Sequence, residues 1–305
     1  MTNLLKDKII IPAWELIKED TKIKKYYIFP WLLSILFLTV LLVYQSIYTY
    51  VEVFWKKDEA LVIILKFFHS DYVFEIWIIT VVFLIIYFLL IPIYEGWLIK
   101  YIHKKNINED ITTTDAFWQW LYKFFPLFEY NNLFSEFKLI SILNGYLFTI
   151  RFIWIEYIST LSYIFFVLFL MWVVFNIFFS YSKHIIILEG KSVFKAIWIS
   201  SKITILNLKR TIKLYFLMFF LNLRVIFNFL IFLSFPIIIV LAIWLITTKI
   251  FLFVAITILT ILFFICILIL WYLTAVLEVF KAATWYYAYI EWRKMIDDDD
   301  HDKNE

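Results

Sequence analysis

Long apolar runs without a single charge alternate along this chain with shorter polar stretches. Residues 26–51 carry no charge, and neither do residues 157–182 or 250–277. A helix needs about 20 apolar residues to cross a bilayer, where all its backbone hydrogen bonds must be internal. The pattern therefore predicts an all-α polytopic membrane protein with six transmembrane helices in three hairpins. The predicted spans lie at 27–49, 76–95, 139–155, 157–181, 225–247 and 250–276.

The third span is predicted from the distribution of positive charge. Residues 139–155 contain Asn144, Gly145 and Arg151, so hydropathy alone does not decide whether they cross. Lys and Arg are enriched in the cytoplasmic loops of membrane proteins. With six spans, the cytoplasmic segments contain 22 of the 28 Lys and Arg residues, and the outer segments contain five. Charge thus favours a multi-pass protein of the cytoplasmic (inner) membrane with its N- and C-termini in the cytoplasm.

A short helix of mixed polar and aromatic residues is predicted before each pair of spans. Each contains an alanine followed by a tryptophan, as in Pro12-Ala13-Trp14, Asp115-Ala116-Phe117-Trp118 and Ala196-Ile197-Trp198. Tryptophan and tyrosine prefer the level of the lipid head groups, which predicts interfacial amphipathic helices. The shared layout of the three units predicts a threefold internal repeat. The alternative is that any helix joining a cytoplasmic loop to a span has this composition. The three helices are expected at 8–24, 114–125 and 192–213.

The third unit contains Ile187-Leu-Glu-Gly-Lys191, followed by Phe194-Lys-Ala-Ile-Trp198 and Ser200-Ser-Lys-Ile-Thr204. With these segments, the layout resembles a broad group of poorly characterised six-span bacterial membrane proteins. That group includes the membrane domain found beside some glycerophosphoryl diester phosphodiesterases. The resemblance implies a membrane role without hydrolase activity, because the phosphodiesterase catalytic domain is absent from the chain.

The composition narrows the class of protein further. Charged residues make up 17% of the chain, whereas a soluble domain has about a quarter. The net charge of +3 is too small to indicate a nucleic-acid partner. No Gly-rich phosphate loop, nucleophile elbow or HExxH motif occurs, and the four histidines are scattered. We therefore expect no enzymatic activity, no cofactor and no metal, and as partners membrane lipids or other membrane subunits.

Arg224 lies in the apolar stretch 214–248 and marks a candidate intramembrane polar site. An isolated cation at mid-bilayer costs several kcal/mol, so such a residue usually faces a partner or a water-filled cavity. Asn228 lies one helical turn further on, and Asn222 and Asn176 are the other candidates for this site. The alternative is that the helix enters the bilayer beside Arg224, whose side chain then extends to the cytoplasmic surface.

Five lysines form a second candidate site, for anionic lipid. Lys195, Lys202 and Lys209 are seven residues apart, and Lys191 and Lys213 extend the row by four residues at each end. On one continuous helix, all five fall within about 40° of one another. Such a row predicts a helix on the membrane surface with its lysines at lipid phosphates. The alternative is that the lysines serve membrane topology alone.

Two glutamates and an acidic tail complete the polar features. Glu95 and Glu278 lie at the cytoplasmic ends of the second and sixth spans, and Glu278 precedes Lys281 by three residues, which predicts a local ion pair. Residues 296–305 are expected to form a disordered acidic tail. The leading functional hypothesis is a protein that organises or handles lipid, or a subunit of a membrane complex. The alternative is a small transporter or channel with a polar site near Arg224.

Overall fold

The computed structural model describes residues 5–20, 22–24, 62, 72–109, 124–134, 139–152, 157–224 and 249–302. Every regular element within these ranges is a helix, which confirms the all-α class. The elements are η1 (Lys6–Ile10), α2 (Ile11–Glu19), α5 (Val73–Asn106), α7 (Phe124–Leu133), α8 (Leu139–Phe152), α9 (Ile158–Phe178), α10 (Ser182–His184), η3 (Ile185–Glu189), α11 (Val193–Leu206) and α13 (Lys249–Asp302). One more helix covers residues 208–224.

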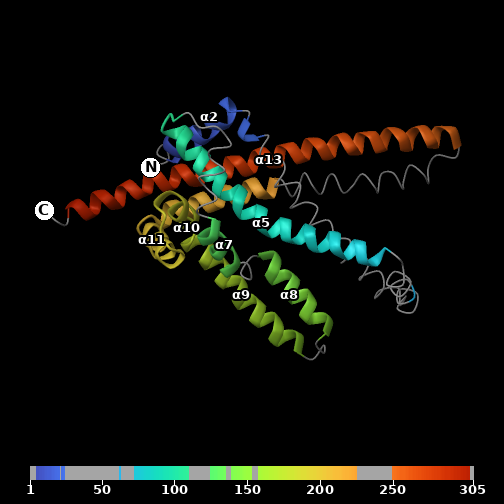
Figure 1. The fold of residues 1–305 in the computed structure, drawn as a ribbon, viewed down its shortest axis with the longest axis horizontal. Helices are drawn as coiled ribbons and strands as arrows, with labels where there is room; N and C mark the ends of the chain where they lie inside the picture. Colours follow the sequence, from blue (N-terminus) through green and yellow to red (C-terminus); the bar gives the residue numbers. More distant parts are fainter. Residues whose placement is uncertain are drawn as a thin grey trace.

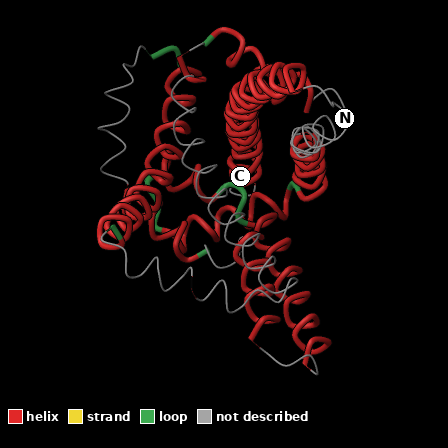
Figure 2. The backbone as a smooth tube through the Cα atoms, turned by 90° about the vertical axis from the view of Figure 1, so that its right-hand side faces the viewer, coloured by secondary structure: helices red, strands yellow, loops and turns green. Residues whose placement is uncertain are grey.

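The described helices form a compact head from which long arms extend (Figure 1). The head contains α2, α7, α10 and α11, together with the C-terminal half of α13. The arms are the N-terminal parts of α5 and α13 and the hairpin of α8 and α9, and they spread apart as they leave the head (Figures 1 and 2). The structure therefore divides into a packed end and a splayed end.

Helix α13 holds the head together because it contributes to both of its main hydrophobic clusters. Tyr286 lies in one cluster with Ala13 of α2 and Leu98 of α5. Trp292 lies in the other with Tyr181 and Ala196. All six side chains are buried. Buried aromatic residues contribute the largest apolar areas per side chain, so this face of α13 dominates the packing of the head.

The described parts of four predicted spans are helical. They correspond to α5, α8, α9 and the N-terminal half of α13, whereas the predicted spans at 27–49 and 225–247 lie outside the described residues. Within the described residues, only α9 is long and apolar enough on its own to cross a bilayer, and Val73–Ile86 forms a shorter apolar stretch. The all-α class is thus established, and the number of spans stays a prediction.

The third predicted surface helix differs from expectation at its C-terminal end. Gly190, with φ 68° in the left-handed region, ends η3, and α11 begins after Ser192 as the sequence predicts. The predicted helix 192–213 is not continuous, however, because Asn207 leaves the helical conformation at φ −118°. The buried Asn207 side chain instead bonds the Ile203 carbonyl and accepts from Arg210. Such local side-chain bonds compete with a continuous helix.

Two of the three predicted repeat units place their shared residues alike. Ala13 and Ala196 are fully buried in the head, whereas Trp14 and Trp198 are 58% and 75% exposed. A small residue allows each surface helix to lie close to the helices behind it. The corresponding residues of the second unit, at 115–118, lie outside the described residues.

The last helix extends past residue 296, where the sequence predicts the start of an acidic tail. Helix α13 continues to Asp302, and Ile296 is 2% exposed within the same cluster as Trp292. Packing of Ile296 into the head keeps the chain helical where composition alone predicts disorder.

Replacing Ala196 with Leu should destabilise the head, because overpacking a buried site costs about 1–3 kcal/mol. We expect a lower thermal midpoint in detergent for Ala196→Leu. The control is Lys195→Leu at the adjacent exposed position, which should leave the midpoint nearly unchanged. Equal midpoints for the two variants would contradict the close packing of α11.

Candidate functional site

A cavity of about 840 Å³ lies where the arms meet the head. Its wall is formed by the head-side ends of α5, α9 and α13, together with α7, α10 and the helix at 208–224. Segments that are far apart in the sequence thus converge on one space. Its volume falls within the range of about 300–1,000 Å³ that is typical of small-molecule sites.

One ion pair in the wall joins three of these elements. The Lys183 ammonium donates to Glu95 Oε2 at 2.6 Å, and Asn131 Nδ2 donates to the same oxygen at 3.2 Å. Lys183 and Glu95 are both about 30% exposed at the side chain, so the pair is neither fully buried nor on the open surface. Glu95 therefore connects α5 with α7 and α10 at the edge of the cavity.

A second ion pair lies on the α13 side of the cavity. Lys281 donates to Glu278 on the preceding turn, as the spacing of these residues predicts, and to Asn222 Oδ1 at 2.7 Å. With the first pair, the wall contains two carboxylates and two ammonium groups. The charges of these four groups cancel.

Between the two ion pairs, the wall contains aromatic residues with a few hydroxyl groups. The Tyr215 hydroxyl contacts the Asn176 carbonyl and lies 2.9 Å from Ser180 Oγ. Burial raises the pKa of Tyr215 to about 12, so its hydroxyl stays protonated. The rings of Tyr215 and Trp285 pack at 4.9 Å between centroids, and those of Phe175 and Phe179 stack at 5.3 Å. The wall therefore offers apolar surface beside fixed hydrogen-bonding groups.

His184 is the buried titratable group of this wall. Its side chain is 5% exposed and stacks on Tyr289 with 5.6 Å between ring centroids. Both ring nitrogens lack a hydrogen-bond partner among the described residues. Burial, together with a smaller effect of the nearby Lys183 charge, lowers the pKa of His184 to about 3, so the imidazole is neutral at physiological pH.

The residues of the predicted polar site are divided between the cavity and the surface. Asn176 and Asn222 both line the cavity. Arg224 is exposed at the end of its described helix and is not among the lining residues. Asn228 lies outside the described residues. The site thus centres on the ends of α5, α9 and α13 and not on Arg224.

Sequence reasoning identified Glu95 but not its pairing with Lys183. The two residues are 88 positions apart, Glu95 on α5 and Lys183 on the short α10 that follows α9. The signal available in the sequence was a pair of opposite charges, each at the cytoplasmic end of a predicted span. His184 gave no signal, because a single histidine carries no spacing information.

The predicted row of five lysines lies on two helices and the loop before them. Lys195 and Lys202 belong to α11, Lys209 and Lys213 to the helix at 208–224, and Lys191 precedes α11. All except the half-buried Lys191 are exposed. The interruption at Asn207 thus divides the row between two helices.

The surface of α11 nevertheless combines lysines with large apolar side chains. Phe194 and Ile205 are 72% and 61% exposed, and Trp198 is exposed to a similar degree. The opposite face of α11 is buried in the head through Ala196 and Ile203. This helix therefore exposes an amphipathic surface of the kind that lies in a membrane interface.

The described residues contain no group of three or more His, Cys, Asp or Glu side chains that could hold a metal ion.

No known protein family matches the chain, and neither a curated protein nor a solved structure matches it. The resemblance to the membrane domain beside phosphodiesterases stays a prediction. The functional proposal below is accordingly built from the cavity and its surroundings.

Stability should fall in mild acid because of His184. Its folded pKa lies below the unfolded value of about 6.5, so below pH 6.5 the unfolded chain binds a proton that the folded protein excludes. This contribution to stability is complete above pH 6.5 and is lost as the pH falls towards 3. Between pH 6.5 and 5 the loss is about 2 kcal/mol.

Thermal midpoints measured across this pH range should therefore fall less steeply for His184→Gln than for the wild type. The control is His103→Gln, because His103 is only half-buried and bonds the Tyr286 hydroxyl at 2.9 Å. The neighbouring titratable groups Lys183, Tyr130 and Glu95 are unchanged in both variants. Identical slopes for His184→Gln and the wild type would show that His184 does not govern acid stability.

Proposed function

We propose that this chain is a non-enzymatic integral membrane protein that binds and handles lipid at the cytoplasmic boundary of the inner membrane. The observation that carries the proposal is the cavity at the junction of head and arms. It combines two ion pairs and several amide groups with an aromatic wall. A site of this composition suits a molecule with a polar head and an apolar tail.

The exposed surface of the arms supports a membrane environment. Trp77 and Ile79 of α5 are 65% and 67% exposed, and Tyr163 of α9 is 70% exposed. Helix α9 buries none of its residues. Each square ångström of apolar surface left in water costs about 25 cal/mol, so exposed surface on this scale favours hydrocarbon surroundings.

Contacts within the head support the proposal that the chain crosses the membrane an even number of times between the segments that meet there. Lys8 pairs with Glu291 at 2.5 Å, which brings the N-terminal helix and the end of α13 to the same side. His103 at the end of α5 reaches Tyr286 of α13, and Glu189 of η3 pairs with Arg293. Three returns of the chain to one head agree with three hairpins, that is, six spans with both termini in the cytoplasm.

The surface of α11 supports a second contact with lipid. Its exposed Phe194 and Trp198 suit the head-group level, and Lys195 and Lys202 then lie near the phosphates. Each lysine near an anionic leaflet contributes about 1 kcal/mol. The head is thereby held against the cytoplasmic leaflet, where the cavity has access to lipid. A role as a subunit of a membrane complex is compatible with the same position of the head at the cytoplasmic leaflet.

A small transporter or channel is the second candidate. Asn176 and Asn222 line one polar cavity at the ends of different helices, as a site for a translocated solute requires. The exposed position of Arg224 outside this cavity weakens this candidate, because it removes the cation that suggested the site. Retained lipid in the purified protein favours lipid handling, and solute flux into protein-containing vesicles favours transport.

Filling the cavity should reduce the lipid that stays bound through purification. We expect Asn176→Trp to lower the lipid measured by mass spectrometry of the purified protein, because the indole occupies part of the space. The control is Val174→Trp, two residues earlier on α9, which is 49% exposed and does not line the cavity. Equal lipid contents for both variants and the wild type would contradict binding in the cavity.

The exposed lysines should determine how much anionic lipid stays with the protein. Replacing Lys195, Lys202 and Lys209 together with Gln should reduce the retained phosphatidylglycerol, because three attractions of about 1 kcal/mol each are removed. The control replaces Lys6, Lys18 and Lys22, which are also exposed but lie at the other surface helix. Equal loss from both triple variants would show that only the total cytoplasmic charge matters.

A further inference from the structure

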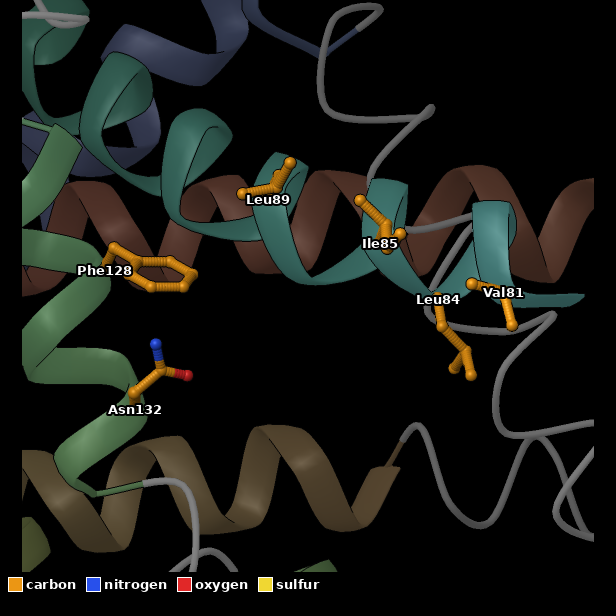
Figure 3. Close-up of a pocket in the computed structure, with 6 residues that line it drawn as sticks. All are labelled: Val81, Leu84, Ile85, Leu89, Phe128 and Asn132. Atoms are coloured by element: carbon orange, nitrogen blue, oxygen red, sulfur yellow. The ribbon is translucent and has the colours of Figure 1, made fainter.

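A second, apolar groove of about 400 Å³ lies between α5 and α7 (Figure 3). One row of α5 side chains forms one side, and Phe128 and Asn132 project from α7 on the other. Apart from Asn132, the lining is hydrocarbon or aromatic. The α5 residues are Val81, Leu84, Ile85 and Leu89.

The groove and the cavity lie along the same face of α5. Glu95 and Ile99, which line the cavity, follow Val81 by 14 and 18 residues. At 100° per residue these separations put Glu95 about 40° from Val81 and Ile99 directly in line with it. Glu95 is six residues beyond Leu89, about 9 Å along the helix axis. One face of α5 thus changes from apolar to charged within two turns.

Helix α7 connects the two spaces from the opposite side. Asn131 donates to Glu95 in the cavity, and the next residue, Asn132, lines the groove. The two elements that form the apolar groove therefore also supply the Glu95 end of the cavity. An extended molecule lying along α5 would contact both.

The charges of the cavity favour a head group with no net charge. Glu95 is paired with Lys183, and Glu278 is paired with Lys281. An anion that binds a lysine here leaves a carboxylate without its counter-charge and close to the anion, which is unfavourable in a partly desolvated site. A zwitterion instead provides an ammonium for the carboxylate and a phosphate for the lysine. Binding of the zwitterion therefore replaces the ion pair between the two side chains with two ion pairs to the ligand, and the net charge of the site does not change.

His184 is an independent indication of a ligand in this wall. Its side chain lines the cavity and is more than nine-tenths buried, yet neither ring nitrogen has a partner among the described residues. Buried polar groups in proteins are almost always hydrogen-bonded, and an orphaned group calls for a bound water, ion or ligand. A polar head group beside His184 supplies such a partner.

We propose that the cavity binds the zwitterionic head group of a phospholipid, its ammonium at Glu95 and its phosphate at Lys183, with an acyl chain in the groove between α5 and α7. This assignment rests on the proposed lipid-handling function and specifies its ligand. Both phosphatidylethanolamine and phosphatidylcholine have the required chemistry. The anionic phosphatidylglycerol lacks it, because its head group has no ammonium.

The test offers an equimolar mixture of these three lipids, with identical acyl chains, to the delipidated full-length protein in which Lys195, Lys202 and Lys209 are replaced by Gln. This background removes the lysines that are proposed to retain phosphatidylglycerol outside the cavity. Native mass spectrometry then measures which lipids are retained. We expect a several-fold preference for one or both zwitterionic lipids over phosphatidylglycerol. Glu95→Gln should abolish this preference, since it removes the partner of the ammonium. The control, Glu189→Gln, removes a carboxylate that pairs with Arg293 away from the cavity and should keep the preference.

The groove is tested by the retention of all three lipids together. Leu84→Trp should lower total retention several-fold without changing the preference between head groups. The control is Ile79→Trp, at an exposed position of α5 that does not line the groove. Only variants whose thermal midpoint equals that of the wild type are compared. If the larger side chain of Leu84→Trp prevents folding, Leu84→Ala replaces it.

The outcomes separate the ligand assignment from the proposed function. A preference for phosphatidylglycerol, or a zwitterion preference that survives Glu95→Gln, overturns the head-group assignment and leaves lipid binding in place. Unchanged retention by both Leu84 variants overturns the acyl-chain assignment. Retention of no lipid by the wild-type protein overturns the proposed function itself.

Discussion

The packing of α13 through the head is the interaction on which the rest of the structure depends. Tyr286 and Trp292 of this helix are fully buried in separate hydrophobic clusters, one built with α2 and α5 and the other with η3 and α11. Polar contacts reinforce both sides, from Glu291 to Lys8 and from Arg293 to Glu189. Because α13, among the described helices, has buried residues in both clusters, its position sets where the other long helices meet.

The functional space is a consequence of that convergence. Helices α5, α9 and α13 spread apart outside the head, and the cavity lies between them where they come together (Figure 1). Charged and amide groups lie in this part of the three helices. Ion pairs such as Glu95 with Lys183 satisfy them without full burial. The packing of the head thus places a polar cavity beside the apolar surface of the arms.

The exposed side of α11 complements the cavity. Lysines and aromatic rings on this helix face away from the core, whereas small and apolar residues such as Ala196 and Ile203 pack inward. The same division occurs in α2, with Ala13 buried and Trp14 exposed. In the proposed placement, these surface helices lie at the level of the lipid phosphates, and the cavity then has access to lipid head groups.

The sequence by itself determined the all-α class, the local pair of Glu278 with Lys281 and the start of α11 after Gly190. These features follow from periodicity, short spacing and backbone preference, which act between near neighbours in the chain. The interruption of α11 at Asn207 was missed because it depends on a buried amide, and the helical course of residues 297–302 was missed because Ile296 is anchored in the head. The union of Glu95, Asn131 and Lys183, and the orphaned imidazole of His184, were decided only by the tertiary structure. Contacts between residues tens of positions apart leave no periodic trace, because they depend on how whole helices pack against α13.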